Sequence, residues 1–220
     1  MELDHIFICT DKNAPAADVL VDFGLVEGSS NVHPGQGTAN RRFFFHNFML
    51  ELIWGENIEE MTSENTKPMR LYEKCILRGS EISPFGLGFR KTNETDNKAP
   101  FPAWDYRPAY LPDPLIVQVA SDTKISEPTY FYLFFAARQD SAGSKKLEPL
   151  EHKIPLREVT SATLFVNQKP PISDAAHIIN RTTYVKIEPA DENLLELNFD
   201  NATRCKQKNF RPYLPLIIKW

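Results

Sequence analysis

Cysteine is scarce in this chain of 220 residues: it has only Cys9, Cys75 and Cys205, and no two of them form a Cys-x-x-Cys pair. A disulfide framework is therefore not expected, and separate free thiols fit a reducing compartment. The first residues also lack a basic segment followed by an apolar one, so the sequence predicts no secretory signal. Together these absences predict a cytoplasmic protein.

Long apolar runs and an excess of basic residues are missing as well. No run approaches the roughly 20 apolar residues that a membrane span needs, so we expect no membrane partner. Lysine and arginine total 25 against 29 aspartates and glutamates, which gives a net charge of −4 and a pI of about 5.8. This balance argues against a general binder of phosphate backbones, so we expect no nucleic-acid partner.

Phenylalanine and proline are plentiful, with 15 and 17 residues, which suits many short strands joined by sharp turns better than a helix bundle. A stretch from residue 92 to residue 114 combines several prolines with Trp104, Tyr106 and Tyr110. We expect these aromatic side chains to anchor an ordered loop. A substrate cage is the alternative for the same three residues.

The hydrophobic pattern of the first 55 residues predicts a strand, a helix and further strands. Residues 3–9 alternate as a strand does, and residues 14–23 carry apolar side chains at helical spacing before Gly24, which suits a helix cap. Strands are expected at residues 42–46 and 49–54. A similar order returns later, with strands at 160–166, 183–187 and 194–199 and a helix at 172–179. The sequence therefore predicts an α+β fold with a weak internal duplication.

Strand alternation singles out three residues that could meet in one cavity. In the segments 50–54 and 195–199, Glu51 and Glu196 point away from the apolar faces, and His5 lies on the face of the first strand opposite Ile6 and Ile8. Imidazole and carboxylate groups together suit divalent zinc, iron, manganese or nickel. The alternative is that both carboxylates face solvent and that the histidine is a hydrogen-bonded core residue.

The loop from residue 33 to residue 40, His-Pro-Gly-Gln-Gly-Thr-Ala-Asn, is the next candidate for binding. Gly35 and Gly37 allow positive φ angles or close approach to a ligand. Substrate contacts are expected from both glycines and from His33, Gln36, Asn40 and Arg42. Thr38 also offers a hydrogen bond, and Arg41 is the alternative to Arg42. An ordinary turn that leads into a strand is the alternative. The loop is not a P-loop, because no Gly-Lys-Ser/Thr sequence ends it.

Several of these segments resemble the glyoxalase-like branch of the vicinal oxygen chelate superfamily. The similarity lies in Leu-Asp-His-Ile at residues 3–6, the loop at 33–40, Leu-Glu-Leu-Ile-Trp at 50–54, and the segments 83–90, 149–152 and 156–160. The pattern His-x-Gly-x-Gly-Thr-x-Asn is the most specific of them. The resemblance covers most of the chain.

The resemblance implies one glyoxalase-like domain over residues 1–220, with two βαβββ-type modules that form a U-shaped, mostly antiparallel sheet around a cleft. We place the first module at 1–56, an inserted segment at 57–158, the second module at 159–200 and a tail at 201–220. The implied metal ligands are His5, Glu51 and Glu196, and either carboxylate could also move a proton. Ser161 occupies the position expected for a fourth ligand, and serine is a poor ligand.

Two functions follow from the resemblance. One is a metal-dependent enzyme of lyase, isomerase or dioxygenase type that acts on a small, oxygen-rich substrate. The other is a protein that binds or sequesters a small molecule without metal, and the shortage of ligands leaves both open. In either case the expected partner is a small-molecule ligand, and a homodimer is compatible with the family.

Overall fold

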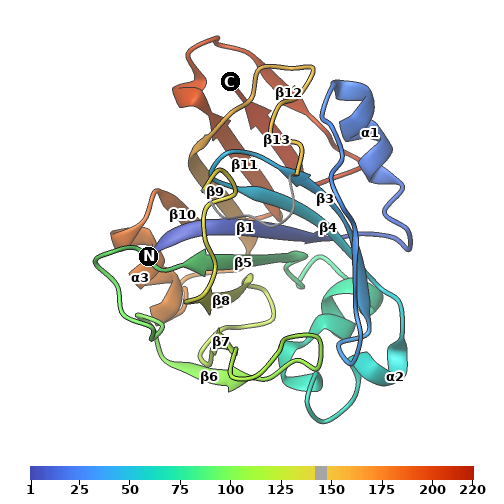
Figure 1. Cartoon of the computed structure of the whole chain (residues 1–220), viewed down its shortest axis with the longest axis vertical. Helices are drawn as coiled ribbons and strands as arrows, with labels where there is room; N and C mark the ends of the chain where they lie inside the picture. Colours follow the sequence, from blue (N-terminus) through green and yellow to red (C-terminus); the bar gives the residue numbers. More distant parts are fainter. Residues whose placement is uncertain (142–147) are drawn as a thin grey trace.

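The computed structural model describes residues 1–141 and 148–220, and the fold is α+β with two mixed sheets and few helices (Figure 1). The larger sheet has eight strands in the order β2-β3-β4-β1-β5-β8-β7-β6. These strands are β1 (Glu2–Cys9), β2 (Asn31–His33), β3 (Thr38–Phe44), β4 (Met49–Gly55), β5 (Phe85–Arg90), β6 (Ala103–Tyr106), β7 (Val117–Ala120) and β8 (Thr129–Leu133).

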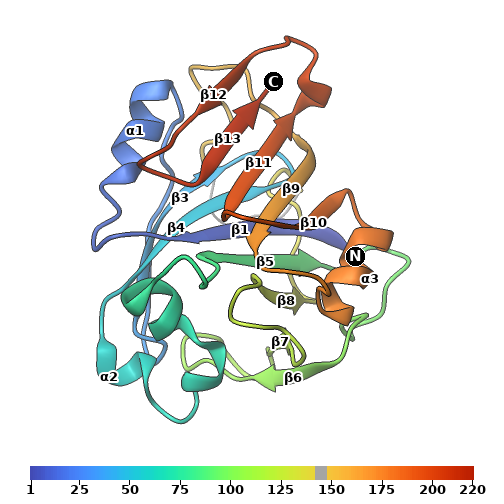
Figure 2. The same cartoon turned by 180° about the vertical axis from the view of Figure 1, so that it is seen from behind.

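The smaller sheet has five strands in the order β10-β9-β11-β13-β12 and lies above the centre of the larger one in Figures 1 and 2. Its strands are β9 (Val159–Asn167), β10 (Val185–Ala190), β11 (Leu194–Phe199), β12 (Gln207–Asn209) and β13 (Leu216–Lys219). The α-helices are α1 (Ala16–Phe23), α2 (Ile58–Met61) and α3 (Asp174–Thr182), and short helical turns cover Lys67–Met69, Glu73–Leu77 and Asp200–Ala202. No helix within the described residues is long and apolar enough to cross a membrane.

The two halves of the eight-stranded sheet share one strand order. In the first half β1 pairs parallel with β4, and β4, β3 and β2 follow as an antiparallel meander. In the second half β5 pairs parallel with β8, and β8, β7 and β6 follow in the same way. The halves meet where β1 runs antiparallel to β5, with Ile6 opposite Leu87. The sheet thus contains a two-fold repeat of strand order.

This topology corrects the expected division of the chain. Residues 57–158 are not an insertion between two copies, because they supply β5 to β8 of the larger sheet. Residues 159–200 do form the predicted strand, helix and two strands, but these belong to the separate five-stranded sheet. The alternation of apolar residues fixes which face of a strand is buried. It does not fix which sheet the strand joins.

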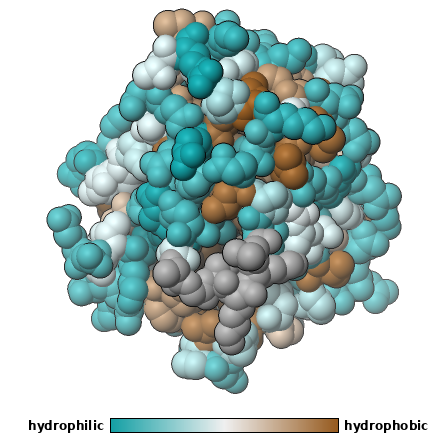
Figure 3. All heavy atoms as spheres, turned by 45° about the horizontal axis from the view of Figure 1, so that its top comes forward, coloured by the Kyte–Doolittle hydropathy of each residue, from teal (hydrophilic) through white to brown (hydrophobic). Residues whose placement is uncertain are grey.

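Two apolar clusters lie on opposite faces of the larger sheet. Ile6 and Leu50 point into the main core, which also contains Leu164 and Leu195 of the smaller sheet. Phe7 points the other way, into a second cluster that includes residues of the helical turns and of β7 and β8. On the surface shown in Figure 3, hydrophobic residues form separate small areas among hydrophilic ones. The candidate site lies on the face of the second cluster.

Candidate functional site

A cavity of about 200 Å³ opens on this face of the eight-stranded sheet. One set of lining residues is polar or charged: His5, His33, Gln36, Asn40, Arg42 and Glu51, with Tyr106 and Tyr110. The other set is apolar: Phe7, Met49, Ile53, Met69, Leu71, Leu111, Val117, Phe131, Leu133 and Phe135. The cavity therefore offers both polar and apolar contacts to a single occupant.

His5 reaches this cavity because strand alternation turns it to the same face as Phe7. A register irregularity between Leu3 and His5 interrupts the ladder with β5 at Asp4. Oδ2 of Asp4 lies 2.7 Å from Nδ1 of His5. The other carboxylate oxygen, Oδ1, accepts a hydrogen bond of 3.1 Å from Arg90. Asp4 therefore fixes the orientation of the imidazole and leaves its Nε2 for the cavity.

The pKa shifts of Asp4 and His5 both favour the charged forms of the pair. Burial alone lowers the pKa of His5, but the hydrogen bond to Asp4 and the charges of Asp4 and Glu51 outweigh it, so the pKa is raised above its usual value. Burial likewise acts to raise the pKa of Asp4, while the interactions with His5 and Arg90 bring it below its usual value. Both shifts follow from attraction between opposite charges in a buried place.

Glu51 comes to the same cavity from β4, as strand alternation predicts. Its Oε1 accepts a hydrogen bond from Nδ2 of Asn40, and its Oε2 lies 4.0 Å from Nε2 of His5. This separation is too long for a hydrogen bond. A ligand atom between the two could, however, lie about 2.8 Å from each, which is hydrogen-bonding distance. His5 and Glu51 are therefore brought together with a gap between them.

The glycine loop forms the turn between β2 and β3, and both glycines have positive φ angles, which is the first of the two expected alternatives: 80° at Gly35 and 77° at Gly37. The turn places the side chain of Gln36 against the cavity, whereas neither glycine lines it. Nε2 of Gln36 donates to the Thr38 hydroxyl over 2.8 Å, and that hydroxyl lies 2.9 Å from Nδ1 of His33. Burial lowers the pKa of His33 and favours its neutral form.

Tyr106 and Tyr110, expected mainly as loop anchors, both line the cavity. The Tyr110 hydroxyl donates to Oε1 of Gln36 over 3.2 Å. Tyr106 is only 1% exposed; burial raises the pKa of its hydroxyl, and the Thr66 hydroxyl beside it acts in the opposite direction. The nearby Thr66 donates its own hydroxyl proton to the carbonyl of Gly35. Proline and aromatic content predicted an ordered loop here, but no spacing in the sequence separated a pocket residue from an anchor.

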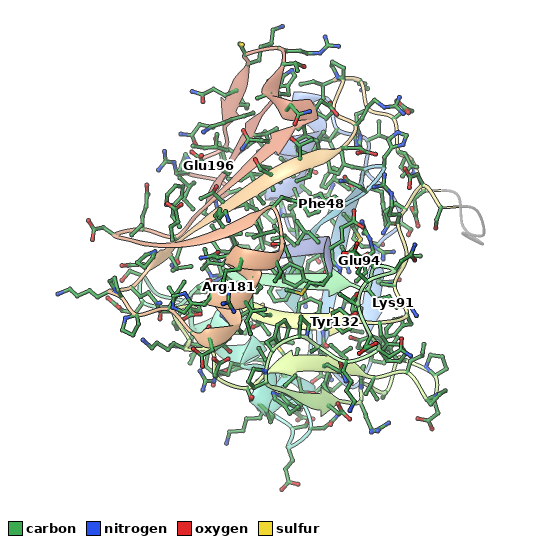
Figure 4. All side chains as sticks on the ribbon, turned by 90° about the vertical axis from the view of Figure 1, so that its left-hand side faces the viewer. Phe48, Lys91, Glu94, Tyr132, Arg181 and Glu196 are labelled. Atoms are coloured by element: carbon green, nitrogen blue, oxygen red, sulfur yellow. The ribbon has the colours of Figure 1, made fainter. Side chains whose placement is uncertain are left out.

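Glu196 does not join His5 and Glu51, which corrects the expected convergence. It lies on β11 of the five-stranded sheet, where Figure 4 shows it away from the larger sheet, and its Oε2 pairs with Nζ of Lys219 at 2.7 Å. Ser161, on the neighbouring strand β9, accepts a hydrogen bond of 2.9 Å from Asn198. Alternation correctly separated Glu196 from the core, but its partly exposed side chain forms a cross-strand ion pair.

The donor set does not fit the metal centre that the resemblance implies. Within residues 1–141 and 148–220, no group of three or more His, Cys, Asp or Glu side chains could hold a metal ion. The repeat of strand order explains the shortage. The two halves of the sheet are related by a two-fold repeat that superimposes Ile6 of β1 on Leu87 of β5. Under this repeat the residue equivalent to His5 is Gly86, and the residue equivalent to Glu51 is Phe131. Neither glycine nor phenylalanine has a side chain that binds a metal, so these two positions contribute no ligand.

A second, smaller cavity is lined by Lys74 and Glu127, but the contacts of Lys74 are structural. Its ammonium group donates to the carbonyls of Glu127 and Ser83, at 2.8 and 3.0 Å, and lies 3.4 Å from that of Ile125. Lys74 is only 2% exposed, and burial lowers its pKa to about 8. The residue fastens the helical turn Glu73–Leu77 to the segment before β8.

This burial predicts a pH effect on stability. In the unfolded chain Lys74 keeps its proton up to its ordinary pKa of 10.5, whereas the folded chain releases it near pH 8. Between these values the unfolded state binds more protons, so the contribution of Lys74 to the free energy of unfolding should rise by roughly 2 kcal/mol from pH 8 to pH 10. Urea unfolding of wild type and Lys74→Met across this range measures it. If the free energy of unfolding changed equally with pH in wild type and Lys74→Met, the prediction would be contradicted. Lys12→Met, which removes a lysine at the surface, is the control and should keep the pH dependence of wild type.

Comparison with known proteins adds support for the fold. No protein-family model matches the chain, and no curated protein matches it. Among solved structures, a hypothetical protein from Staphylococcus aureus is similar over 99% of this chain and 98% of its own, with a TM-score of 0.54 and 11% sequence identity. At this identity the similarity concerns the fold alone, so the chain shares an overall α+β architecture with that protein.

Proposed function

We propose that the chain has the glyoxalase-like fold of the vicinal oxygen chelate superfamily, with module boundaries different from those expected from sequence. The two modules would be residues 2–55 and 85–133, and together they would curve around the cavity. The shared strand order of the two halves supports this assignment. The second module would have residues 91–102, which form no helix, in the place that α1 occupies in the first.

The function supported best is the binding of a small organic molecule in this cavity without a metal ion. The observation that carries the proposal is the cavity itself, where Nε2 of His5 and Oε2 of Glu51 lie 4.0 Å apart without a hydrogen bond between them. A ligand atom between these two groups would bond to both. The apolar side chains that also line the cavity can cover an apolar body.

Catalysis is the second candidate, and the Asp4–His5 pair favours it. A carboxylate that orients an imidazole, whose free nitrogen faces a second carboxylate, can accept a proton at one point of a ligand and return it at another. Isomerase or lyase chemistry of this kind would use Glu51 and His5 as proton carriers. Glu196 would take no part. The metal-dependent form of this function, including dioxygenase chemistry, lacks support from the donor set.

The proposed function is tested by filling the cavity. Val117→Phe places a ring in the space that an occupant would use, and Glu196→Gln alters a carboxylate outside it. We expect molecules that raise the melting temperature of wild type in a small-metabolite screen to do so in Glu196→Gln and to lose their effect in Val117→Phe. Circular dichroism verifies that both variants fold. Ligands that bind Val117→Phe unchanged would place binding elsewhere.

Metal content distinguishes a metal-free site from a metal-dependent one. Protein purified without chelator and supplied with zinc, iron, manganese and nickel should hold well below one ion per chain, because His5 and Glu51 provide only two protein ligands. Mass spectrometry of bound metal measures this. One ion per chain that is lost in Glu51→Gln and kept in Glu196→Gln would contradict a metal-free site.

A further inference from the structure

We propose that the occupant of the cavity is a small monocarboxylate with an apolar body, and that Arg42 binds its carboxylate. This inference rests on the proposed function and names the chemical class of the ligand. It starts from a difference between two adjacent arginines. Strand alternation sends Arg41 and Arg42 of β3 to opposite faces of the sheet, and only Arg42 lines the cavity.

Arg41, on the face away from the cavity, is fully paired. Its guanidinium group contacts Glu27 at 2.6 Å and Asp18 at 2.9 Å. These contacts raise its pKa further above the ordinary value, the hydrogen bond to Glu27 being the largest cause. A second arginine with no function in binding would be expected to find a similar partner.

Arg42 has no such pairing. It lies directly opposite Glu51 in the ladder between β3 and β4, yet no carboxylate oxygen of the described residues is within 4.0 Å of its guanidinium nitrogens. Burial lowers its pKa, while the charges of Glu51 and Glu148 act to raise it, and an arginine remains charged at neutral pH. A partly buried cation that lines a cavity and has no carboxylate oxygen within 4.0 Å is well suited to an anionic ligand.

Local contacts hold the Arg42 side chain in place without using all of its donors. Nε and Nη2 both donate to Ser29 over 2.7 Å, to its carbonyl and its hydroxyl respectively, and the guanidinium carbon lies 5.0 Å from the centre of the Phe44 ring. Nη1 donates to no group in the described part of the chain. Because the side chain is already ordered, little rotamer entropy would be lost when a carboxylate binds.

The other charged side chains that line the cavity already have close partners. Glu51 accepts a hydrogen bond from Asn40 and faces His5, and His5 is paired with Asp4. Arg42 is therefore the charged lining group without a carboxylate at close range, and one negative charge on the ligand would pair with it. A dianion would bring a second charge close to Glu51, so the geometry favours a monoanion.

The size and lining of the cavity define the rest of the ligand. A volume of about 200 Å³ is below the roughly 300–1,000 Å³ typical of drug-sized ligands, so the occupant is a smaller molecule. The lining also includes the apolar side chains of Leu71, Val117, Phe131 and Leu133. An aryl or branched alkyl group on a short carboxylic acid matches these side chains.

The test compares acids with their neutral amides. The full chain is titrated calorimetrically with phenylacetate, 3-phenylpropionate and 4-methylpentanoate, and with the three corresponding amides. We expect at least one of the acids to bind, with its amide at least tenfold weaker. Arg42→Gln should weaken binding of that acid at least tenfold and remove its preference over the amide. Arg41→Gln, which removes the same charge from the other face, should leave both affinities unchanged.

The outcomes distinguish this inference from the proposed function. Amides that bind wild type as tightly as the acids would overturn the carboxylate assignment and leave the small-molecule site standing. Binding of neither series, to protein shown to be folded, would count against both. The comparison of acid with amide on wild type does not depend on the variants, so it holds even if Arg42→Gln unfolds. Equal loss of acid binding in Arg41→Gln and Arg42→Gln would also overturn the inference, because it would indicate a general effect of charge.

Discussion

Replacing Gly86 by alanine should lower the free energy of unfolding by about 3 kcal/mol, a large effect for the addition of one methyl group. Gly86 lies opposite Phe7 in the ladder between β1 and β5, and a Cβ atom on it would overlap Cε1 and Cζ of the Phe7 ring. The ring is 4% exposed and stacks against Phe131, with ring centres 6.2 Å apart, so it has little room to move. Urea denaturation with circular dichroism measures the loss.

A second substitution shows whether the overlap is the cause. Phe7→Leu shortens the side chain that crosses Gly86, so Gly86→Ala should cost much less in the Phe7→Leu background than in wild type. A coupling energy of more than about 1 kcal/mol between the two sites is the expected result of the double-mutant cycle. Additive losses would show that Gly86 matters for another reason, such as the backbone of β5.

The glycines of β5 also bear on why the second half of the sheet contributes no metal ligand among the described residues. A Cβ on Gly88, the next residue of β5 on this face, would lie 2.6 Å from Cε1 of His5 and 2.7 Å from Cε2 of Phe131. The two glycines therefore leave room for the rings of His5, Phe7 and Phe131 over the middle of the sheet. A larger residue at either position, including a metal ligand, would collide with these rings.

Much of the local structure could be predicted from the sequence, because it depends on neighbouring residues. Alternation correctly placed Glu51 and His5 on the face opposite Leu50 and Ile6. Gly24 caps α1 with a φ of 116°, as its position after the apolar stripe predicted. The positive φ angles of Gly35 and Gly37 also followed from residue type, since glycine adopts them without a steric penalty.

Contacts between distant segments were beyond the sequence patterns. The Leu-Glu-Leu segments around Glu51 and Glu196 alternate alike, and both are strands, but nothing in that period says that they join different sheets. The contribution of Asp4 was missed because alternation sends it to the opposite face from His5. A register irregularity in the ladder accompanies its bond to the neighbouring imidazole, and no residue pattern indicated that irregularity.

Replacing Arg90 by methionine should lower the free energy of unfolding by about 3–5 kcal/mol, because it removes one of the two cationic partners of a buried carboxylate. Arg90 is 2% exposed at the end of β5. Its guanidinium group contacts Glu2 at 2.8 Å and Asp4 at 3.1 Å, and it donates to the carbonyl of Asn47 over 2.9 Å. Methionine can replace the packing of the side chain but none of these hydrogen bonds.

The pH dependence of this loss has a definite sign. Because interactions with His5 and Arg90 hold the pKa of Asp4 below its ordinary value of 3.8, Asp4 contributes stability above that pH and loses it as pH falls through its folded-state pKa. Without Arg90 the folded-state pKa of Asp4 moves upward. The penalty of Arg90→Met should therefore be larger at pH 7 than at pH 3, which urea unfolding at the two values measures.

Arg138 supplies a matched control for this prediction. It contacts three carboxylates, those of Glu2, Asp140 and Glu158, where Arg90 contacts two, but its side chain is 35% exposed. Ion pairs of this kind contribute at most about 1 kcal/mol, since water and salt screen them. Arg138→Met should thus cost far less than Arg90→Met, although it removes the same charge. Equal losses in the two variants would show that net charge, and not the burial of the Asp4–His5 pair, determines the effect.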